Sequence, residues 1–416
     1  MRVLATFLGK ARRNEHGESR YETALYRFED GWIRKGSYFG LELAEMEQPD
    51  RLVLLGTPSS MWDVLVEDVA ADPAEEALRL ELLDAVERGA VGQDLLDRIA
   101  PVLSRHLGRD TQLHVIPRGV SDEDQRAILA VLDEACAGAD EVALDVTHGF
   151  RHLGMLGVVS AAFLERLHSR LRVGSLWYGA HEMRHGNENA APVLRLDGLL
   201  AIQRWVEALD RFDASGDYGV FEPLLVADGM PADKARCLRD AAYLEKTLNL
   251  PAARQKLMTF LPVLDAPLPG ASGLFRKRLA QRLDWIERDS LAEQQRLLAQ
   301  RALNRNDYLR AAIFGVEAMI SGQFDPKDPA QREYAAREAA DKAFQQSLRE
   351  GDHPDWKRSA YWLLKNLRNA MAHGLPPAEE SYTFVDGKKR PIAQLLKNED
   401  ALRTEMQRCL SRLGST

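Results

Sequence analysis

Residues 141–155, EVALDVTHGFRHLGM, constrain the fold of this 416-residue chain more than any other stretch. The segment opens with the apolar run 142–144, which is typical of a buried strand, and then enters a polar turn that ends at Gly149. After the turn, apolar residues recur at helical spacing from Leu153 to Phe163. A strand, a tight polar turn and a helix place ligand groups at the carboxyl edge of a parallel sheet, where the first helical amides suit a phosphate.

A second interpretation of the same turn stays open. Asp, Thr and Gly also serve only to cap a helix and to make the corner in strand-to-helix turns that bind nothing. His148 by itself does not distinguish the two interpretations.

Strand and helix patterns alternate through the first half of the chain. Buried strands are expected at 2–8, 51–55, 112–117, 141–146, 172–178 and 192–196, with a hairpin at 21–33 after the first strand. This alternation predicts an α/β fold with a mostly parallel, doubly wound sheet. From Leu199 onward the pattern becomes helical, so the rest of the chain is expected to be all-α.

Polar segments follow the first two strands as well. The first strand ends at Gly9 and Lys10, within the basic run 10–13, which suits either a phosphate-bearing ligand or a solvated loop. The second strand ends at the segment 56–60, GTPSS, whose small hydroxyl side chains suit phosphate or ribose contacts. Ser59 or Ser60 would equally serve as the cap of a helix through Trp62.

Near the end of the chain, residues 354–373 form one amphipathic helical pattern. Asn369 and His373 lie four residues apart on its polar side, and Arg368 lies at the boundary with the apolar stripe. His373 falls in the last turn, where the helix dipole stabilises an imidazolium, which suits proton transfer. A plain solvated face is the alternative. In the apolar helix 306–319, Glu317 either pairs with Arg368 or lies at the helix edge.

Composition restricts the function classes. The net charge of −8 argues against a broadly basic nucleic-acid surface, so any RNA contact must be a local basic patch or short-lived. Three distant cysteines give no disulfide framework and favour a reducing cytosol. No run of about 18 apolar residues indicates a membrane span, and the N-terminus lacks the order of a signal peptide, so a cytoplasmic protein is expected.

The pentapeptide 181–185 reads H-E-M-R-H, which satisfies the pattern of zinc metalloproteases. That chemistry needs two histidines on one face of a helix, whereas this segment follows a strand directly and is followed by Gly186. We therefore expect a polar loop between strands and no metal site.

Four motifs in order resemble a known family. Residues 145–151, DVTHGFR, resemble the D-x-T-H-G-F-R signature of CRISPR-associated proteins with an N-terminal CARF domain, a Rossmann-like sensor of cyclic oligoadenylates. Residues 55–62 are similar to the second motif of this group, and residues 177–180 match a third. Residues 368–373, RNAMAH, resemble the R-N-x-x-x-H signature of HEPN ribonucleases. Together the motifs span most of the chain.

The resemblance implies a CARF domain at 1–198, a helical connector at 199–273 and a helical HEPN domain at 274–416. It implies no cofactor, and an activator that is a cyclic oligoadenylate, with the tetra-adenylate as the expected ring. The implied ligand contacts are Gly9, Lys10, Gly56, Thr57, Ser59, Ser60, Thr147, His148, Gly149 and Arg151. The family usually carries a smaller polar residue where Lys10 stands, so the resemblance gives the place of this contact and not its nature.

The resemblance also implies the chemistry of a type III CRISPR ancillary effector. Two HEPN helices meet across a homodimer, or within a higher oligomer, and cleave single-stranded RNA without a metal. The products are a 2′,3′-cyclic phosphate and a 5′-hydroxyl. His373 would act as general acid or base or position the scissile group, Arg368 would neutralise developing charge, and Asn369 would hold this pair or the RNA.

Two other functions stay open at this stage. In one, the protein is a ligand sensor whose HEPN half is only a dimerisation scaffold. In the other, the CARF domain degrades its own activator. We expect His373→Ala to abolish RNA cleavage and to leave ligand binding intact.

Overall fold

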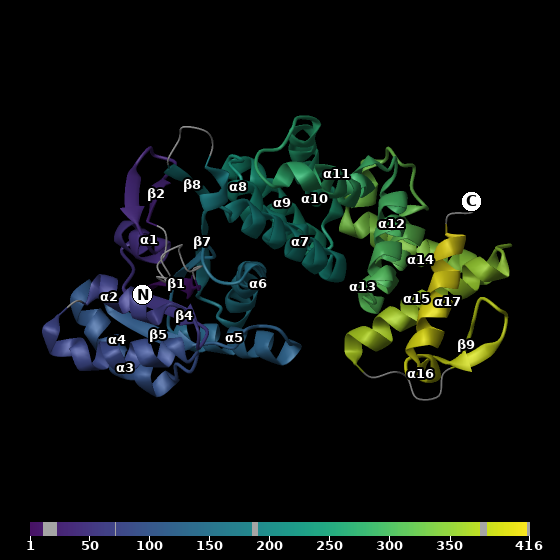
Figure 1. Ribbon diagram of the computed structural model, residues 1–416. Helices are drawn as coiled ribbons and strands as arrows, with labels where there is room; N and C mark the ends of the chain where they lie inside the picture. Colours follow the sequence, from purple (N-terminus) through teal and green to yellow (C-terminus); the bar gives the residue numbers. More distant parts are fainter. Residues whose placement is uncertain (11–22, 71, 185–189, 375–380, 414–416) are drawn as a thin grey trace. The chain divides into compact units, whose positions relative to one another are not determined.

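The computed structural model describes residues 1–10, 23–70, 72–184, 190–374 and 381–413. The chain divides into two compact units, Met1–Gln203 and Arg204–Thr416, and helix α7 (Asp197–Ser215) contains the boundary between them (Figure 1). An α/β unit followed by a helical unit confirms the expected fold class. Among the described residues, no helix is long and apolar enough to cross a membrane.

The first unit is built on an eight-stranded sheet in the order β3-β2-β8-β7-β6-β1-β4-β5. Strand β1 pairs in parallel with β4 and β6, and β5 and β7 extend the parallel core on either side. Strands β7 and β8 are antiparallel, as are β2 and β3. The bounds are β1 (Arg2–Leu8), β2 (Ala24–Arg27), β3 (Ile33–Gly36), β4 (Arg51–Gly56), β5 (Asp110–Val115), β6 (Glu141–Asp145), β7 (Arg172–Gly179) and β8 (Ala190–Arg195).

Both faces of this sheet are covered, which explains why its strands read as continuous apolar runs. In β1, Val3 and Phe7 belong to an apolar cluster with α5 and α6, whereas Leu4 and Leu8 belong to a cluster with α1, α2 and α4. Because side chains alternate along a strand, one run of residues serves two cores. The helices are α1 (Phe39–Glu47), α2 (Trp62–Val69), α3 (Glu76–Glu87), α4 (Gln93–Leu107), α5 (Asp122–Ala135) and α6 (Arg151–Leu167).

Serine residues precede helices α5 and α2, and only one of these helices has a serine side chain as its N-cap. Ser121 accepts a hydrogen bond from the amide of Asp124 at 3.1 Å and caps α5, as its position predicts. Helix α2 begins after Met61 without a side-chain cap, so neither Ser59 nor Ser60 serves as the cap that the alternative interpretation offered. Ser60 instead donates to the carbonyl of Leu8 at 2.8 Å, because closing the turn between β4 and α2 onto the end of β1 uses its hydroxyl.

The second unit is a helical assembly around one apolar cluster that extends from Trp205 to Leu410. The implied boundary between the connector at 199–273 and the HEPN domain at 274–416 lies inside this unit, and this division stays a prediction. The elements are α8 (Glu222–Ala227), α9 (Ala232–Lys246), α10 (Leu250–Phe260), α11 (Ser272–Leu283), α12 (Leu291–Asn304), α13 (Tyr308–Ser321), α14 (Tyr334–Glu350), α15 (Asp355–His373), α16 (Ile392–Leu395) and α17 (Glu399–Arg412), with a hairpin of β9 (Ser381–Thr383) and β10 (Lys389–Pro391).

Helices α13 and α15 pack closely and run antiparallel. A Cβ atom at Gly315 of α13 would lie 3.0 Å from Cδ1 of Leu364 of α15, so a larger residue would require this leucine side chain to shift. Farther along, Met319 and Trp356 line one cavity, which fixes the relative direction of the two helices. The C-terminal end of α15, with His373, therefore lies at the same end of the pair as the start of α13 at Tyr308.

Candidate functional site

Strands β6, β1 and β4 are neighbours in the sheet, so their carboxyl ends lie side by side. Thr6 of β1 is in register with Asp145 of β6, and Leu8 is in register with Gly56 of β4. The three polar segments that the sequence singled out, at 9–10, 56–60 and 147–151, consequently leave the sheet at one edge. This is the edge at which open parallel sheets bind ligands.

The loop after β4 is held mainly by its own hydroxyl groups. The amide of Thr57 donates to Oγ of Ser60 at 2.9 Å, and both side chains are buried. The amide of Met61 donates to the carbonyl of Gly9 at 3.0 Å, which ties this loop to the end of β1. Thr57 and Ser60 thus shape the loop, whereas Ser59 is half-buried and Lys10 is exposed.

Gly56 has a steric reason to be glycine. A Cβ atom at this position would lie 2.5 Å from the indole ring of Trp62, which is fully buried at the start of α2. The glycine therefore lets the buried tryptophan close under the loop, and its expected ligand contact is limited to backbone groups.

Asp145, at the end of β6, is fully buried and fastens the next turn. Its carboxylate accepts the hydroxyl of Thr6 at 2.6 Å and the amide of Thr147 at 2.9 Å. Burial raises the pKa of Asp145 to about 6, and these hydrogen bonds oppose that shift. The hydroxyl of Thr147 accepts the amide of Gly179 at 2.7 Å, so it links the turn to the end of β7.

The side chain of His148 contacts both Phe39 and Tyr38. Its Nε2 accepts the amide of Phe39 at 3.1 Å, and its ring lies 5.0 Å from that of Tyr38. Burial lowers the pKa of His148 to about 4, and the nearby His181 adds to the effect. The imidazole is therefore neutral near pH 7, and it acts as a hydrogen-bond acceptor that positions the start of α1.

Two residues of the motif at 145–151 are exposed to solvent. Gly149 is exposed and has a φ of +96°, a conformation that side chains with a Cβ rarely adopt. Arg151 is exposed at the first position of α6, whose N-cap residue Phe150 makes no side-chain cap. The exposed cations Lys10 and Arg151 and the first amides of α6 are the groups here that suit a phosphate.

Sequence reasoning missed a polar cluster at the end of β7. The hydroxyl of Tyr178 donates to Glu182, and burial raises the pKa of Tyr178 to about 12, an effect that Arg151 opposes. Nε of Arg184 donates to the carbonyl of His181 at 3.2 Å. The motif at 177–180 pointed to this strand end, but nothing in its pattern assigned these side chains to the same edge as Arg151.

The H-E-x-x-H segment is a short turn and not a long helix. Residues His181–Met183 form one 3₁₀ turn after β7, as the sequence predicts, and His185 lies outside the described residues. In the part of the chain that the structure describes, no group of three or more His, Cys, Asp or Glu side chains is arranged to hold a metal ion.

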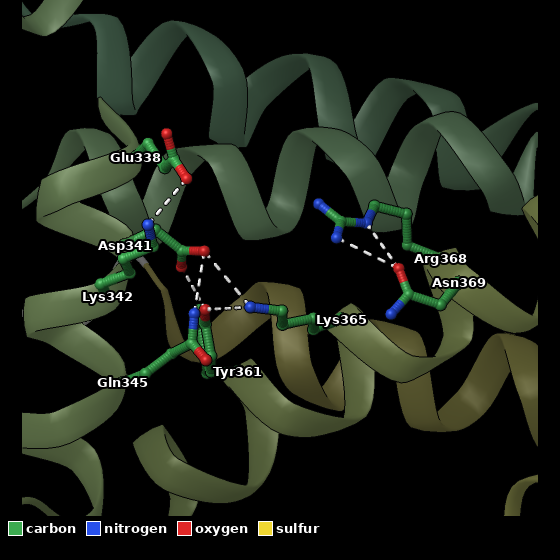
Figure 2. Close-up of polar contacts among 8 residues, drawn as sticks. All are labelled: Glu338, Asp341, Lys342, Gln345, Tyr361, Lys365, Arg368 and Asn369. Carbon is green, nitrogen blue, oxygen red and sulfur yellow. Dashed lines mark hydrogen bonds and ion pairs between the residues drawn. The ribbon is translucent and has the colours of Figure 1, made fainter. Parts of the chain in front are cut away.

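In the second unit, the R-N-x-x-x-H motif lies on the last two turns of α15 (Figure 2). Nε and Nη2 of Arg368 donate to Oδ1 of Asn369 at 3.2 and 3.1 Å. Asn369 and His373 are exposed one turn apart, and Gly374 ends the helix at a φ of +69°. The motif thus presents a guanidinium, an amide and an imidazole at one helix end.

Glu317 has a different partner from the one that the sequence offered. Its carboxylate pairs with Arg337 at the start of α14, and Arg337 also donates to Oγ of Ser321 at 3.0 Å. The guanidinium of Arg368 is therefore bonded to an amide oxygen, which leaves its charge available to an anion.

A second cluster, not anticipated from the sequence, lies one turn before the motif (Figure 2). Asp341 of α14 accepts the hydroxyl of buried Tyr361, Nζ of Lys365 at 3.2 Å and the amide of Gln345 at 2.9 Å. Burial and the carboxylate raise the pKa of Tyr361. Because Tyr361, Lys365, Asn369 and His373 recur every four residues, this cluster holds in place the helix face that carries the motif.

The first unit is similar to the CARF domains of CRISPR-associated proteins. Residues 3–181 match the family model described as the CARF domain of the CRISPR system endoribonuclease Csx1. The chain is also 26% identical over 294 residues to the CRISPR-associated protein MJ1674 of Methanocaldococcus jannaschii. That alignment covers 64% of this chain and 44% of the relative, so the chain spans less than half of the relative's length.

Proposed function

We propose that this protein is a type III CRISPR ancillary effector in which a cyclic oligoadenylate bound to the CARF unit activates cleavage of single-stranded RNA by the helical unit. The observation that carries the proposal is the R-N-x-x-x-H motif at an exposed helix end, in a chain whose first unit matches a CARF domain. Activation requires the ligand to bind the active arrangement more tightly than the inactive one.

The ligand site of this proposal is the edge formed by the loops after β1, β4 and β6. Lys10 and Arg151 contact phosphates, and backbone groups at Gly9, Gly56 and Gly149 allow a close approach. Thr57, Ser60, Thr147 and His148 act mainly through the hydrogen bonds that shape the loops. Among the hydroxyl side chains of the loop after β4, Ser59 is the one that contacts the ligand. Cyclic tetra-adenylate is the proposed activator.

The catalytic group of this proposal is Arg368, Asn369 and His373 from each of two copies of the chain. The ribose 2′-oxygen loses its proton and attacks the adjacent phosphorus, while the 5′-oxygen leaves and gains a proton. The products are a 2′,3′-cyclic phosphate and a 5′-hydroxyl. His373, in the last helical turn, takes or gives a proton. Arg368, oriented by Asn369, stabilises the charge that develops on the phosphate.

The test is cleavage of a fluorescently labelled single-stranded RNA in EDTA, with no activator, with cyclic tetra-adenylate and with cyclic hexa-adenylate. We expect cleavage with one ring only, and its loss in His373→Ala. No cleavage under any condition would refute the proposal and favour a ligand sensor whose helical unit is a dimerisation scaffold. Incubation of the ring with His373→Ala protein shows separately whether the CARF unit opens its own activator.

A further inference from the structure

A small cavity in the second unit is lined mostly by arginine and polar side chains. It has a volume of about 260 Å³ and lies between the ends of α7, α11 and α12. Its lining residues are Phe212, Asp213, Gln281, Arg282, Arg301, Asn304 and Arg305. Three guanidinium groups therefore face one space that holds a single carboxylate.

Two of the three arginines are paired, and the third is not. Arg282 forms an ion pair with Asp213 at 2.6 Å, and Arg301 pairs with Asp284. Across the described part of the chain, no carboxylate lies within 4.0 Å of a guanidinium nitrogen of Arg305. Arg305 is half-buried, and burial lowers its pKa, although arginine remains charged at neutral pH. The carboxylates of Glu245 and Asp213, which lie beyond ion-pair distance, oppose this shift. A cation in this state gains from an anionic ligand.

The guanidinium of Arg305 is held in a fixed place by an aromatic ring. It lies 5.0 Å from the centre of the Phe212 ring, and the guanidinium of Arg282 lies 5.1 Å from the same centre. Phe212 itself is buried, so it forms a fixed support for both cations. The Arg305 charge is thereby preorganised, which lowers the entropy cost of binding a phosphate.

The basic surface continues from the cavity along α11. This helix, SGLFRKRLAQRL, contains no acidic residue. Lys277 and Arg278 are exposed. Gln281, which lines the cavity, follows Lys277 by four positions and Arg278 by three, so the three side chains share one helix face. In a chain with a net charge of −8, this is a local positive surface of the kind that RNA binding requires.

The position of this surface connects it to the proposed catalytic motif. Arg305 precedes the first residue of α13, Tyr308, by three positions. Because α13 and α15 run antiparallel, the start of α13 and the end of α15 at His373 lie at the same end of the pair. We propose that Arg305, with Lys277 and Arg278, binds phosphates of the single-stranded RNA substrate beside the R-N-x-x-x-H motif. The inference rests on the proposed ribonuclease function.

The test measures RNA binding and RNA cleavage separately on the full chain. Binding of a labelled single-stranded RNA is followed by fluorescence anisotropy across a salt series in the His373→Ala background, which prevents cleavage. Arg305→Ala and the double variant Lys277→Ala/Arg278→Ala are compared with Arg239→Ala. The control removes an exposed arginine of the same unit that is paired with Glu222 at 3.3 Å.

We expect each test variant to weaken RNA binding about tenfold, uniformly across sequences, while Arg239→Ala binds normally. The logarithm of the RNA association constant decreases linearly with the logarithm of the salt concentration, and this slope becomes less steep by about 0.7 for each phosphate that the variant no longer neutralises. In the background with His373 intact, KM for RNA rises and kcat is unchanged, because the substitution removes an interaction made equally in the ground and transition states. Binding of the cyclic oligoadenylate stays at the wild-type level.

Wild-type RNA affinity, salt slope and KM in both test variants would overturn this inference while leaving the ribonuclease proposal intact. Absence of RNA cleavage by the wild-type chain would instead refute the ribonuclease proposal itself. Should Arg305→Ala fail to fold, the double variant on the exposed face of α11 decides the matter, because substitutions there disturb no buried side chain.

Discussion

Asp145→Asn provides the sharpest test of how the turn after β6 is built, because the carboxyl group of Asp145 is fully buried. Burial raises its pKa from the ordinary value of 3.8 to about 6. An acid whose pKa is raised by folding stabilises the folded state fully below pH 3.8, and this contribution is lost as pH rises through about 6. The wild-type chain should therefore lose stability relative to the asparagine variant between about pH 4 and pH 7.

The size of the effect follows from the pKa change. A rise of about 2 pKa units corresponds to about 3 kcal/mol in the free energy of unfolding. Asparagine keeps a carbonyl oxygen to accept the amide of Thr147, and its amide group faces the hydroxyl of Thr6, which can accept. The variant therefore retains both hydrogen bonds and removes the titration.

Differential scanning calorimetry of the full chain at several pH values measures the effect. For a unit of about 200 residues, 3 kcal/mol corresponds to about 6–12 °C, so the difference in Tm between the two proteins should change by this amount from about pH 4 to pH 7. His148, whose pKa burial lowers to about 4, destabilises both proteins equally in acid and cancels in the comparison.

Asp140→Asn is the matched control. The carboxylate of Asp140 is exposed, and its hydrogen bond with the terminal amine lowers its pKa, so its contribution to stability is lost as pH falls. Its substitution should shift the pH dependence in the opposite direction. A difference between wild type and Asp145→Asn that stays constant from about pH 4 to pH 7 would refute the argument from burial.

Three further outcomes are expected. His373→Ala should slow RNA cleavage at least about a hundredfold, since it removes the proton-transfer group, while calorimetric titration shows unchanged activator binding. Arg151→Ala should weaken activator binding about tenfold because it removes a charged group that meets a phosphate, with the cleavage rate restored at saturating activator; unchanged affinity would exclude this role. Gly149→Ala should lower the free energy of unfolding by about 1–2 kcal/mol in urea titrations, because a φ of +96° strains a residue with a Cβ; full stability would contradict the assigned turn.

Much of the first unit follows from its sequence because strands and motifs are local patterns. The run at 2–8 matches β1 at both ends, and the signature at 145–151 begins at the last residue of β6. Parallel pairing then brings the ends of β1, β4 and β6 to one edge without any knowledge of side-chain positions. The amphipathic pattern at 354–373 likewise predicts α15 within one residue.

Which residues face a ligand and which hold the loops depends on tertiary contacts. The sequence treats the hydroxyls of Ser59 and Ser60 alike, but only Ser60 closes onto Leu8. It also treats His148 as a polar turn residue, whereas its Nε2 accepts an amide 109 positions away along the chain. Hydrogen bonds between distant segments leave no periodic pattern, so sequence reasoning does not separate loop-forming residues from exposed ones.

The order of the two units, the strands of the central sheet, the place of the motif at 145–151 and the helix that carries Arg368 and His373 all follow from the sequence. These features depend on hydrophobic period and short motifs, which neighbouring residues encode. The pairing of Glu317 with Arg337, and the position of Arg305 against the ring of Phe212 beside Arg282, depend on how distant helices pack. The attraction between two charged side chains depends on the distance between them in space, and the packing of helices that are remote in sequence sets that distance.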